Sequence, residues 1–174
     1  MIRDAVAADA SAIAAIYADY VRTTAITFEE DAPDEAEMKR RLAATQPSHP
    51  WLVATDAAGM IAGYAYARPY HARPAYRWAC ETSIYLARDR RRRGIGRRLY
   101  EALLAELTVR GFVTAIGAIT VPNAESTRFH EALAFRAIGV MAGIGFKHGR
   151  WHDVGYYQRD LAPRAAPPAA VRGA

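Results

Sequence analysis

A turn with two glycines beside a run of arginines is the part of this chain best suited to bind an anion. Gly94 and Gly96 follow a strand-like segment and open a stretch whose apolar residues recur at helical spacing. Such a turn leaves backbone N–H groups free at the positive end of a helix dipole, where phosphate groups bind. Seven arginines lie between Arg88 and Arg98. The combination predicts a site for the pyrophosphate of a nucleotide-bearing cofactor.

Three other interpretations of this turn fit the sequence less well. A dinucleotide-binding Rossmann turn needs a third glycine, where this chain has Leu99. A Walker-type loop needs Gly-Lys-Ser/Thr, which the chain lacks. A solvated basic run or a nucleic-acid patch is the third alternative. Because such a patch has no need of glycines that open a helix, we expect no nucleic-acid partner.

Two titratable side chains are candidates for taking a proton from an amine, which is mostly protonated at pH 7. Glu81 lies in a strand-like segment among apolar neighbours; the alternative is a strand carboxylate paired with a nearby arginine. His130 lies in a short predicted helix, and neutral imidazole titrates in the useful range. The alternative for His130 is local packing or capping.

Length and composition indicate one domain and a reducing compartment. The 174 residues suffice for one buried core, and 52% of them are apolar. No apolar run approaches the roughly 20 residues that span a membrane, and the start of the chain lacks a signal peptide's apolar centre. The single cysteine, Cys80, excludes an internal disulfide. We expect a cytoplasmic protein with no membrane partner, whose net charge of +5 suits a polyanionic ligand.

The predicted elements alternate between extended and helical patterns, which indicates an α/β fold with a sheet of mixed direction. Strands are predicted over residues 2–6, 51–55, 60–68, 78–86, 112–120, 135–140 and 154–161. Helices are predicted to begin at Asp9, at the capping box of residues 34–37, after Gly96 and at Ala124. Loops are predicted over 23–30, 69–77 and 143–153. Residues 1–161 form the predicted domain, and the Pro- and Ala-rich segment 162–174 has nothing to bury, so we expect a disordered tail.

The glycine turn resembles the acetyl-CoA signature of the GNAT N-acetyltransferases. Arg91-x-x-Gly94-x-Gly96 after a strand matches their pattern Gln/Arg-x-x-Gly-x-Gly/Ala. Residues 2–161 are similar to the phosphinothricin acetyltransferases and their relatives that act on methionine sulfoximine or methionine sulfone. The segments that carry this likeness are 51–54, 75–78, 81–86, 122–123, 130–133 and 145–155.

The resemblance implies a fold, a reaction and an assembly. The fold would be the GNAT fold, a mixed central sheet flanked by helices. The reaction would move the acetyl group of acetyl-CoA to the α-amine of a small amino acid or analogue, by direct attack in a ternary complex. Glu81 would be the general base and His130 would assist it. The enzyme would be a homodimer.

The cofactor site is expected around the end of one strand and the glycine turn. If residues 84–86 stop pairing, their backbone groups can bind the pantetheine amides, and the Leu86 N–H can stabilise the oxyanion. The resemblance implies that Asn123 hydrogen-bonds the pantetheine arm; the alternative is a helix N-cap. The predicted cofactor residues are Ile84, Tyr85, Leu86, Arg92, Arg93, Gly94, Ile95, Gly96, Arg97 and Asn123.

An amino-acid acceptor also needs its acidic group held. The loop at 69–77 offers His71 and Arg73 as anion holders, Thr82 and Ser83 offer hydroxyls, and Phe28 offers an apolar wall. For each, a surface role is an equal alternative. The predicted substrate residues are Phe28, His71, Ala72, Arg73, Glu81, Thr82 and Ser83.

Several questions stay open from the sequence. Residues 147–153 contain two histidines and an aspartate but no third nitrogen or sulfur ligand, so no metal site is predicted. Arg77, Pro74, His71 and Cys80 depart from the family pattern, which leaves the acceptor undecided. Acetylation of a protein or polyamine amine, or CoA binding without turnover, are the alternative functions. The proline-bounded loop at 69–77 favours a closed pocket over an open groove for a protein.

Overall fold

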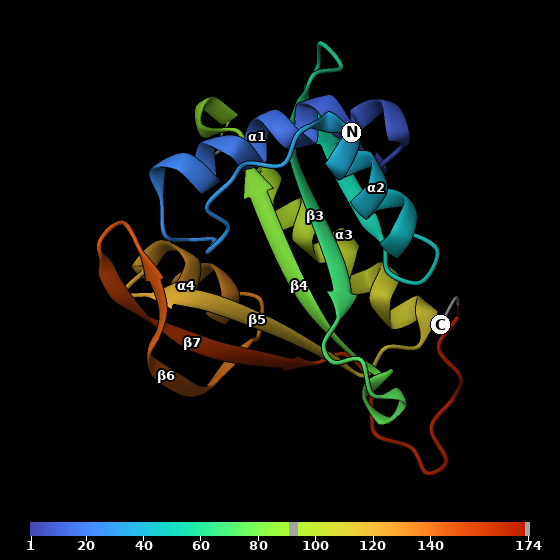
Figure 1. Ribbon diagram of the computed structural model, residues 1–174. Helices are drawn as coiled ribbons and strands as arrows, with labels where there is room; N and C mark the ends of the chain where they lie inside the picture. Colours follow the sequence, from blue (N-terminus) through green and yellow to red (C-terminus); the bar gives the residue numbers. More distant parts are fainter. Residues whose placement is uncertain (91–93, 173–174) are drawn as a thin grey trace.

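Seven strands form one sheet in the order β1-β2-β3-β4-β5-β7-β6 (Figure 1). The computed structural model describes residues 1–90 and 94–172. Among the described strands, β4 and β5 pair in parallel and the other neighbours pair antiparallel, so the mixed α/β sheet is confirmed. The strands are β1 (Ile2–Asp4), β2 (Trp51–Thr55), β3 (Ile61–Pro69), β4 (Ala79–Leu86), β5 (Thr114–Val121), β6 (Arg136–Lys147) and β7 (Arg150–Asp160).

Helices cover both faces of the sheet (Figure 1). One face carries α1 (Ala10–Thr23) and α2 (Glu35–Thr45), and the other carries α3 (Ile95–Arg110) and α4 (Ala124–Glu131). Leu99, Leu103 and Leu107 of α3 are fully buried, as their spacing predicts.

Local sequence explains where two of these helices begin or end. The Asp34 side chain accepts a hydrogen bond from the Glu37 N–H and caps α2, as predicted. Gly111 ends α3 with a φ of 95°, a conformation that favours glycine. The Asp9 side chain was expected to cap α1, but it makes no capping hydrogen bond to that helix. Its carboxylate pairs with Arg3 at 2.7 Å and accepts the Val6 N–H instead, so it ties β1 to the start of the first helix.

Successive residues of β3 and β4 alternate between two cores. Ala65, Ala67 and Cys80 lie in the core under α3, while Tyr64 and Tyr85 lie in the core under α1 and α2. The aromatic rings on the second side pack closely, with Tyr64 and Tyr85 centroids 5.4 Å apart. The two faces of the central strands therefore offer different chemistry.

The β4–β5 pair is short, and this shapes the site. The strands pair only from Ala79 to Glu81 on β4, opposite Thr114 to Ile116 on β5. Beyond Glu81 the two strands diverge (Figure 1). The second half of β4 therefore faces a wedge-shaped opening, as predicted for a strand that stops pairing.

The chain differs from the sequence-based expectation at its C-terminal hairpin. Residues 143–153 were expected to be a loop, but β6 continues to Lys147 and β7 begins at Arg150. The two-residue turn between them has positive φ at His148 and Gly149, 51° and 75°, which suits a tight hairpin. A register shift between Met141 and Gly145 absorbs the glycines of this stretch.

The tail also differs from the expectation that it has nothing to bury. Val171 is buried in the core under α3, and the Arg172 N–H donates to the Arg110 carbonyl. The Trp78 indole N–H donates to the Ala169 carbonyl at 2.7 Å. One buried valine and these two hydrogen bonds thus fasten the end of the tail to the domain.

Candidate active site

A groove of about 320 Å³ lies on the face of the sheet that carries α3 and α4. It is lined by the second half of β4, the first turn of α3 and the start of α4. Gly94 forms the N-cap of α3 with a φ of 69°, and a Cβ there would meet open space. At Gly96 a Cβ would lie 3.0 Å from Leu86 Cδ1, so a larger residue would press on the Leu86 side chain where α3 approaches β4. A phosphate at this helix N-terminus and an extended arm along β4 both fit the groove.

The backbone of β4 turns toward the groove. The Ala87 N–H donates to the Ala62 carbonyl, so Leu86 forms a non-hydrogen-bonded pair with Gly63. The N–H and C=O groups of Ile84 and Leu86 therefore face away from β3, into the wedge. At Leu86 they meet Tyr20 of α1, whose hydroxyl accepts the Leu86 N–H at 3.1 Å and donates to the Leu86 carbonyl at 2.7 Å.

The structure brings together most of the described residues predicted to bind the cofactor. Those that line the groove are Ile84, Leu86, Gly94, Gly96, Arg97 and Asn123. Tyr85 points to the other face, where it packs on Tyr17 and Tyr20, and Ile95 packs against the core under α3. Arg92 and Arg93 lie outside the described residues. Asn123 accepts the Ser126 N–H and so also caps α4, the alternative considered for it.

Glu81 lies on the opposite face from this groove, at the last residue of β4 that pairs with β5. Its carboxylate accepts a hydrogen bond from Arg68, with Nη2 and Oε1 2.6 Å apart. Arg68 faces Glu81 directly across the β3–β4 register. The Glu81 side chain is 18% exposed and the Arg68 side chain 54% exposed, so the pair is open to a ligand. An arginine partner for this carboxylate was the alternative interpretation of the sequence, and the structure contains that pair.

Thr82 and His130 belong to the other face. The Thr82 hydroxyl contacts the Tyr100 hydroxyl at 2.7 Å, and Tyr100 lies 3.2 Å from His130 Nε2. His130 Nδ1 lies 2.8 Å from the Ser126 carbonyl. Burial lowers the pKa of His130, and the Ser126 carbonyl offsets this in part. Thr82 is 4% exposed, so the structure places its hydroxyl on the face opposite Glu81 and away from the predicted acceptor side.

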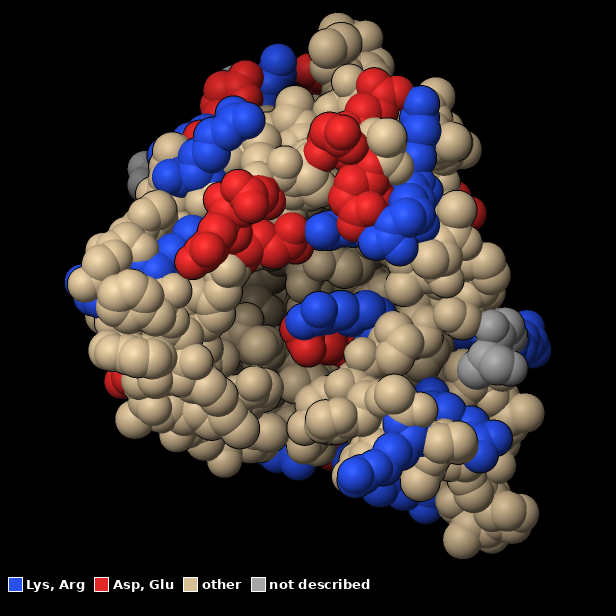
Figure 2. Space-filling model, in the orientation of Figure 1, with Lys and Arg blue, Asp and Glu red and all other residues tan. Residues whose placement is uncertain are grey.

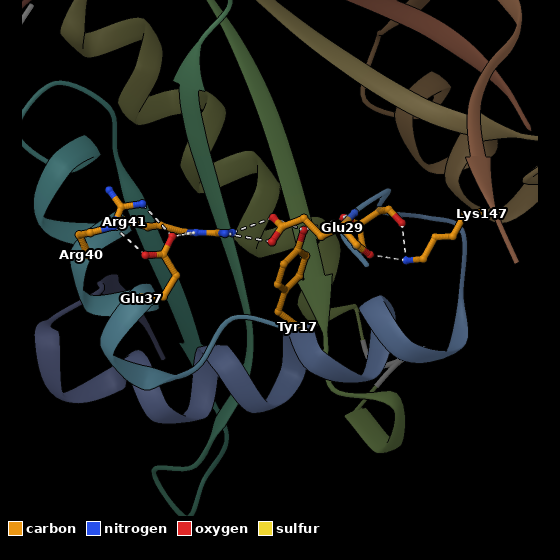
Figure 3. A network of polar contacts seen from close by, with 7 residues as sticks. Tyr17, Glu29, Glu37, Arg40, Arg41 and Lys147 are labelled. Atoms are coloured by element: carbon orange, nitrogen blue, oxygen red, sulfur yellow. Dashed lines mark hydrogen bonds and ion pairs between the residues drawn. The ribbon is translucent and has the colours of Figure 1, made fainter. Parts of the chain in front are cut away.

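The loop between α1 and α2 borders the Glu81 face and is held from both sides (Figure 3). Arg41 of α2 binds the Glu29 carboxylate through both terminal nitrogens, at 2.7 and 2.9 Å, and the Tyr17 hydroxyl donates to it at 2.9 Å. Burial raises the pKa of Glu29, but the Arg41 and Tyr17 hydrogen bonds outweigh it and leave that pKa below its usual value. Lys147 of β6 donates to the Thr27 and Glu29 carbonyls at 2.8 and 2.7 Å.

This loop encloses a cavity of about 390 Å³ between α2, β2 and β3. Trp51 and Tyr66 stack in its wall with centroids 4.1 Å apart, and Arg41 and Arg68 reach it. Figure 2 shows a hollow at the centre of this face, with acidic and basic side chains at its rim. The aromatic wall suits a hydrocarbon chain and the arginines suit an anion.

The other predicted substrate residues take three different positions. Ser83 lies on the Glu81 face, two residues along β4. The Phe28 ring packs against Gly145 of β6 so closely that no Cβ fits there. His71, Ala72 and Arg73 are exposed in the loop after β3, where His71 packs on Tyr70 and Tyr76.

The described residues, 1–90 and 94–172, contain neither a metal-binding cluster nor a membrane-spanning helix. No group of three His, Cys, Asp or Glu side chains there is placed to hold a metal ion. No helix there is long and apolar enough to cross a membrane.

Comparisons with known proteins decide the family. The family model described as "Acetyltransferase (GNAT) domain" matches residues 2–155. The chain belongs to the GNAT acetyltransferases. It is 41% identical over 171 residues to a phosphinothricin N-acetyltransferase of Streptomyces viridochromogenes, covering 98% of this chain and 92% of that protein. It is 36% identical to an L-methionine sulfoximine/L-methionine sulfone acetyltransferase of Pseudomonas paraeruginosa, with 96% and 98% covered.

A solved structure agrees with the same assignment. A GNAT superfamily phosphinothricin acetyltransferase from Sinorhizobium meliloti, crystallised with acetyl-CoA, superposes on this GNAT acetyltransferase with a TM-score of 0.92. The two are 40% identical, and 99% of this chain and 94% of that one are covered. The predicted family, fold and co-substrate are therefore confirmed: this is an acetyl-CoA-dependent N-acetyltransferase of the phosphinothricin acetyltransferase type.

Proposed function

We propose that this GNAT acetyltransferase moves the acetyl group of acetyl-CoA to the α-amine of a small amino acid or analogue, with Glu81 as the general base. The observation that carries this proposal is the position of Glu81. It lies where β4 and β5 begin to diverge, and its carboxylate is on the face opposite the cofactor groove. An amine beside Glu81 and a thioester reaching through the wedge would meet at this point.

The chemical steps follow from the two sides of the wedge. The acceptor ammonium gives a proton to Glu81, and the resulting amine attacks the thioester carbonyl in a ternary complex. The C–N bond forms, the C–S bond breaks, and the CoA thiolate leaves and takes up a proton. The Leu86 N–H faces the wedge and is our candidate donor to the oxyanion, with the Tyr20 hydroxyl as its present partner.

His130 has a supporting role in this proposal. It is buried and joined to β4 through Tyr100 and Thr82, on the face opposite Glu81. These contacts support a positioning role for His130, which would hold β4 in place from the face opposite the Glu81 carboxylate. Ser83 and Phe28 border the acceptor side, and the exposed His71, Ala72 and Arg73 would contact the acceptor only at its outer end.

We also propose a homodimer that meets through β6. This edge strand and the start of β7 expose a row of large apolar side chains, which is a surface typical of an interface. They are Ile138, Val140, Met141, Ile144, Phe146 and Trp151. Light scattering of the wild type and of Val140→Lys tests this, since a charge in the row should shift the enzyme toward monomer.

We further propose that the enzyme is cytoplasmic. There it would inactivate a toxic amino-acid analogue by acetylating its amine. The free and buried Cys80 supports a reducing compartment. Fractionation of cells that produce the untagged chain tests the location directly.

The decisive experiment for the activity is CoA release by the purified enzyme with acetyl-CoA. The acceptors are L-phosphinothricin, L-methionine sulfoximine, L-methionine sulfone, the common amino acids, a polyamine and a peptide with a free N-terminus. Saturable release with a small amino acid or analogue, and an N-acetyl product by mass spectrometry, is the expected result. Release only with the peptide or the polyamine would replace the proposed acceptor. Tight acetyl-CoA binding with no release would favour a non-catalytic CoA-binding module.

A further inference from the structure

The Tyr20 hydroxyl lies against the backbone edge of β4 that faces the wedge. It accepts the Leu86 N–H at 3.1 Å and donates to the Leu86 carbonyl at 2.7 Å. One side-chain oxygen therefore takes the place that a neighbouring strand would take in a continuous sheet. Tyr20 and Leu86 both line the groove proposed for acetyl-CoA. The hydroxyl thus binds the same backbone groups that an extended ligand along β4 would use.

The hydrogen-bonding capacity of Leu86 makes one of these two contacts exclusive. A backbone N–H carries a single proton, whereas a carbonyl oxygen has two lone pairs. The Leu86 N–H already has the Tyr20 oxygen as its partner, so a ligand oxygen takes this donor only when the hydroxyl gives it up. The Leu86 carbonyl can accept from Tyr20 and from a ligand N–H together. The exchange is therefore confined to one hydrogen bond.

Contacts of α1 hold Tyr20 beside the end of β4. The Tyr20 ring packs edge-on against Tyr85, with centroids 5.0 Å apart. On either side of Tyr20 along the helix, Asp19 and the Thr23 hydroxyl bind the Arg88 side chain, which follows β4 directly. The helix is thus tied to the same segment that its tyrosine contacts. Release of the N–H then needs a movement of the hydroxyl and not of α1.

We propose that the Tyr20 hydroxyl is an internal competitor of acetyl-CoA, which holds the Leu86 N–H until a carbonyl oxygen of the co-substrate replaces it. The inference rests on the proposed use of the groove by acetyl-CoA, and it adds a residue of α1 that sets the strength of that binding. The hydroxyl stabilises the enzyme before acetyl-CoA binds. It also weakens acetyl-CoA binding, because one hydrogen bond within the protein is lost when the complex forms.

The variant Tyr20→Phe keeps the ring and removes the hydroxyl. Its melting temperature should be lower by about 2 to 6 °C, because two hydrogen bonds are lost. It should nevertheless bind acetyl-CoA roughly 3- to 10-fold more tightly, since the co-substrate oxygen no longer displaces a partner within the protein. Calorimetry with acetyl-CoA and no acceptor measures the dissociation constant. Lower stability together with higher affinity is the signature of a competitor, whereas a residue that only supports the groove would lower both.

Tyr17→Phe is the matched control, about one turn earlier on the same helix. The Tyr17 ring also packs on Tyr85, with centroids 4.9 Å apart. Its hydroxyl contacts Thr27 and Glu29 instead of the backbone of β4. This change should also lower the melting temperature, but it should leave the dissociation constant for acetyl-CoA within twofold of the wild-type value.

A comparison of acetyl-CoA with CoA identifies the oxygen that replaces the hydroxyl. CoA keeps the two amide carbonyls of pantetheine and lacks the thioester carbonyl. An equal gain in the affinity of Tyr20→Phe for both ligands supports the inference and assigns the exchange to an amide oxygen. A gain for acetyl-CoA alone supports it and assigns the exchange to the thioester oxygen.

An affinity of Tyr20→Phe that is unchanged or weaker for both ligands would overturn the inference, since the hydroxyl would then not compete with either of them. That result would leave the proposed acetyl transfer standing, because CoA release with a small amino acid tests the reaction separately. A gain in affinity in an enzyme that acetylates none of the acceptors would support the inference and remove the proposed function.

Discussion

The two sides of the sheet build their binding sites in different ways. The groove proposed for the cofactor is centred on the backbone of one short stretch, in which the end of β4, Gly94 and Gly96 follow one another in the chain, and side chains of α1 and of the α4 region complete it. The acceptor side uses charged and aromatic side chains from α1, α2, β2, β3 and β4, held by ion pairs. A backbone site demands little beyond glycines in the right place. In a site made of side chains, one substitution can change which ligand binds. We therefore expect substitutions to change the acceptor while acetyl-CoA remains the co-substrate.

The largest effect that tests this difference between the two sides of the sheet is expected at Glu81. Glu81→Gln keeps the shape of the side chain and removes its ability to take a proton, so kcat should fall roughly 10²- to 10⁴-fold. The dissociation constant for acetyl-CoA, measured by calorimetry, should stay within twofold, because the cofactor groove lies on the other face. Glu106→Gln on α3 is the matched control. A variant that kept more than a tenth of the wild-type kcat would remove Glu81 as the base.

The loop that borders the acceptor side provides the next largest effect. Lys147→Met removes two hydrogen bonds to the Thr27 and Glu29 carbonyls, so we expect a loss of about 2 kcal/mol in unfolding free energy. Because Phe28 and Glu29 lie on the loosened loop, the KM for the acceptor should rise several-fold while that for acetyl-CoA does not. Denaturant unfolding and steady-state kinetics measure both. Lys39→Met, on the exposed face of α2, should change neither by a comparable amount.

The sequence predicted the glycine turn that lines the groove because this feature is local. A strand, two glycines and a helix start lie within residues 79–97, and spacing alone identifies each of them. Tyr20 was missed because it reaches Leu86 from a helix 66 residues earlier, and no local pattern encodes such a contact. Arg68 had a detectable signal. The predicted strands 60–68 and 78–86 follow one another in the chain, and pairing them antiparallel would have placed Arg68 near the beginning of the second strand.

The position of Thr82 on the face opposite Glu81 has a simple physical origin. Adjacent residues of a strand point to opposite faces, so Glu81 and Thr82 cannot both border one pocket. The length of the hairpin of β6 and β7 was underestimated for another reason, since the glycines between residues 143 and 149 resemble a loop until the partner strand is known. The burial of the tail was not predicted because its Pro- and Ala-rich composition gives little weight to one valine. Val171 is buried in a site that α3 and Gly111 create.

A smaller effect is expected on the cofactor side, at Gly96. In Gly96→Ala the new methyl would lie 3.0 Å from Leu86 Cδ1 and press on the groove wall. Alanine gains up to about 1 kcal/mol of helix stability over glycine, which offsets the crowding in the free enzyme. We therefore expect nearly unchanged stability but a five- to tenfold higher KM for acetyl-CoA, with the acceptor KM unchanged. An unaltered acetyl-CoA KM would show that the groove wall at Gly96 does not contact the co-substrate.

The smallest effect concerns His130 and the dependence of stability on pH. Burial lowers the pKa of this histidine below the ordinary value of 6.5, so the unfolded chain takes up a proton at a higher pH than the folded one. Stability is therefore unaffected by this group well above pH 6.5 and falls as the pH drops below it, by at most about 1.4 kcal/mol per pH unit. His130→Gln should make the unfolding free energy between pH 7 and pH 5 less steep. Burial also lowers the pKa of His49, which accounts for part of the slope that remains.

His130→Gln also distinguishes a positioning role of this histidine in catalysis from a role in packing alone. If His130 positions β4 beneath the base, kcat should fall several-fold at pH 8, where the histidine is neutral in both states and stability is unaffected by its titration. If it only fills the space beside Gly117 and Tyr100, the pH slope changes and kcat at pH 8 does not. The second result would agree with a division between the two faces, since the His130 side chain would then not influence the chemistry at Glu81.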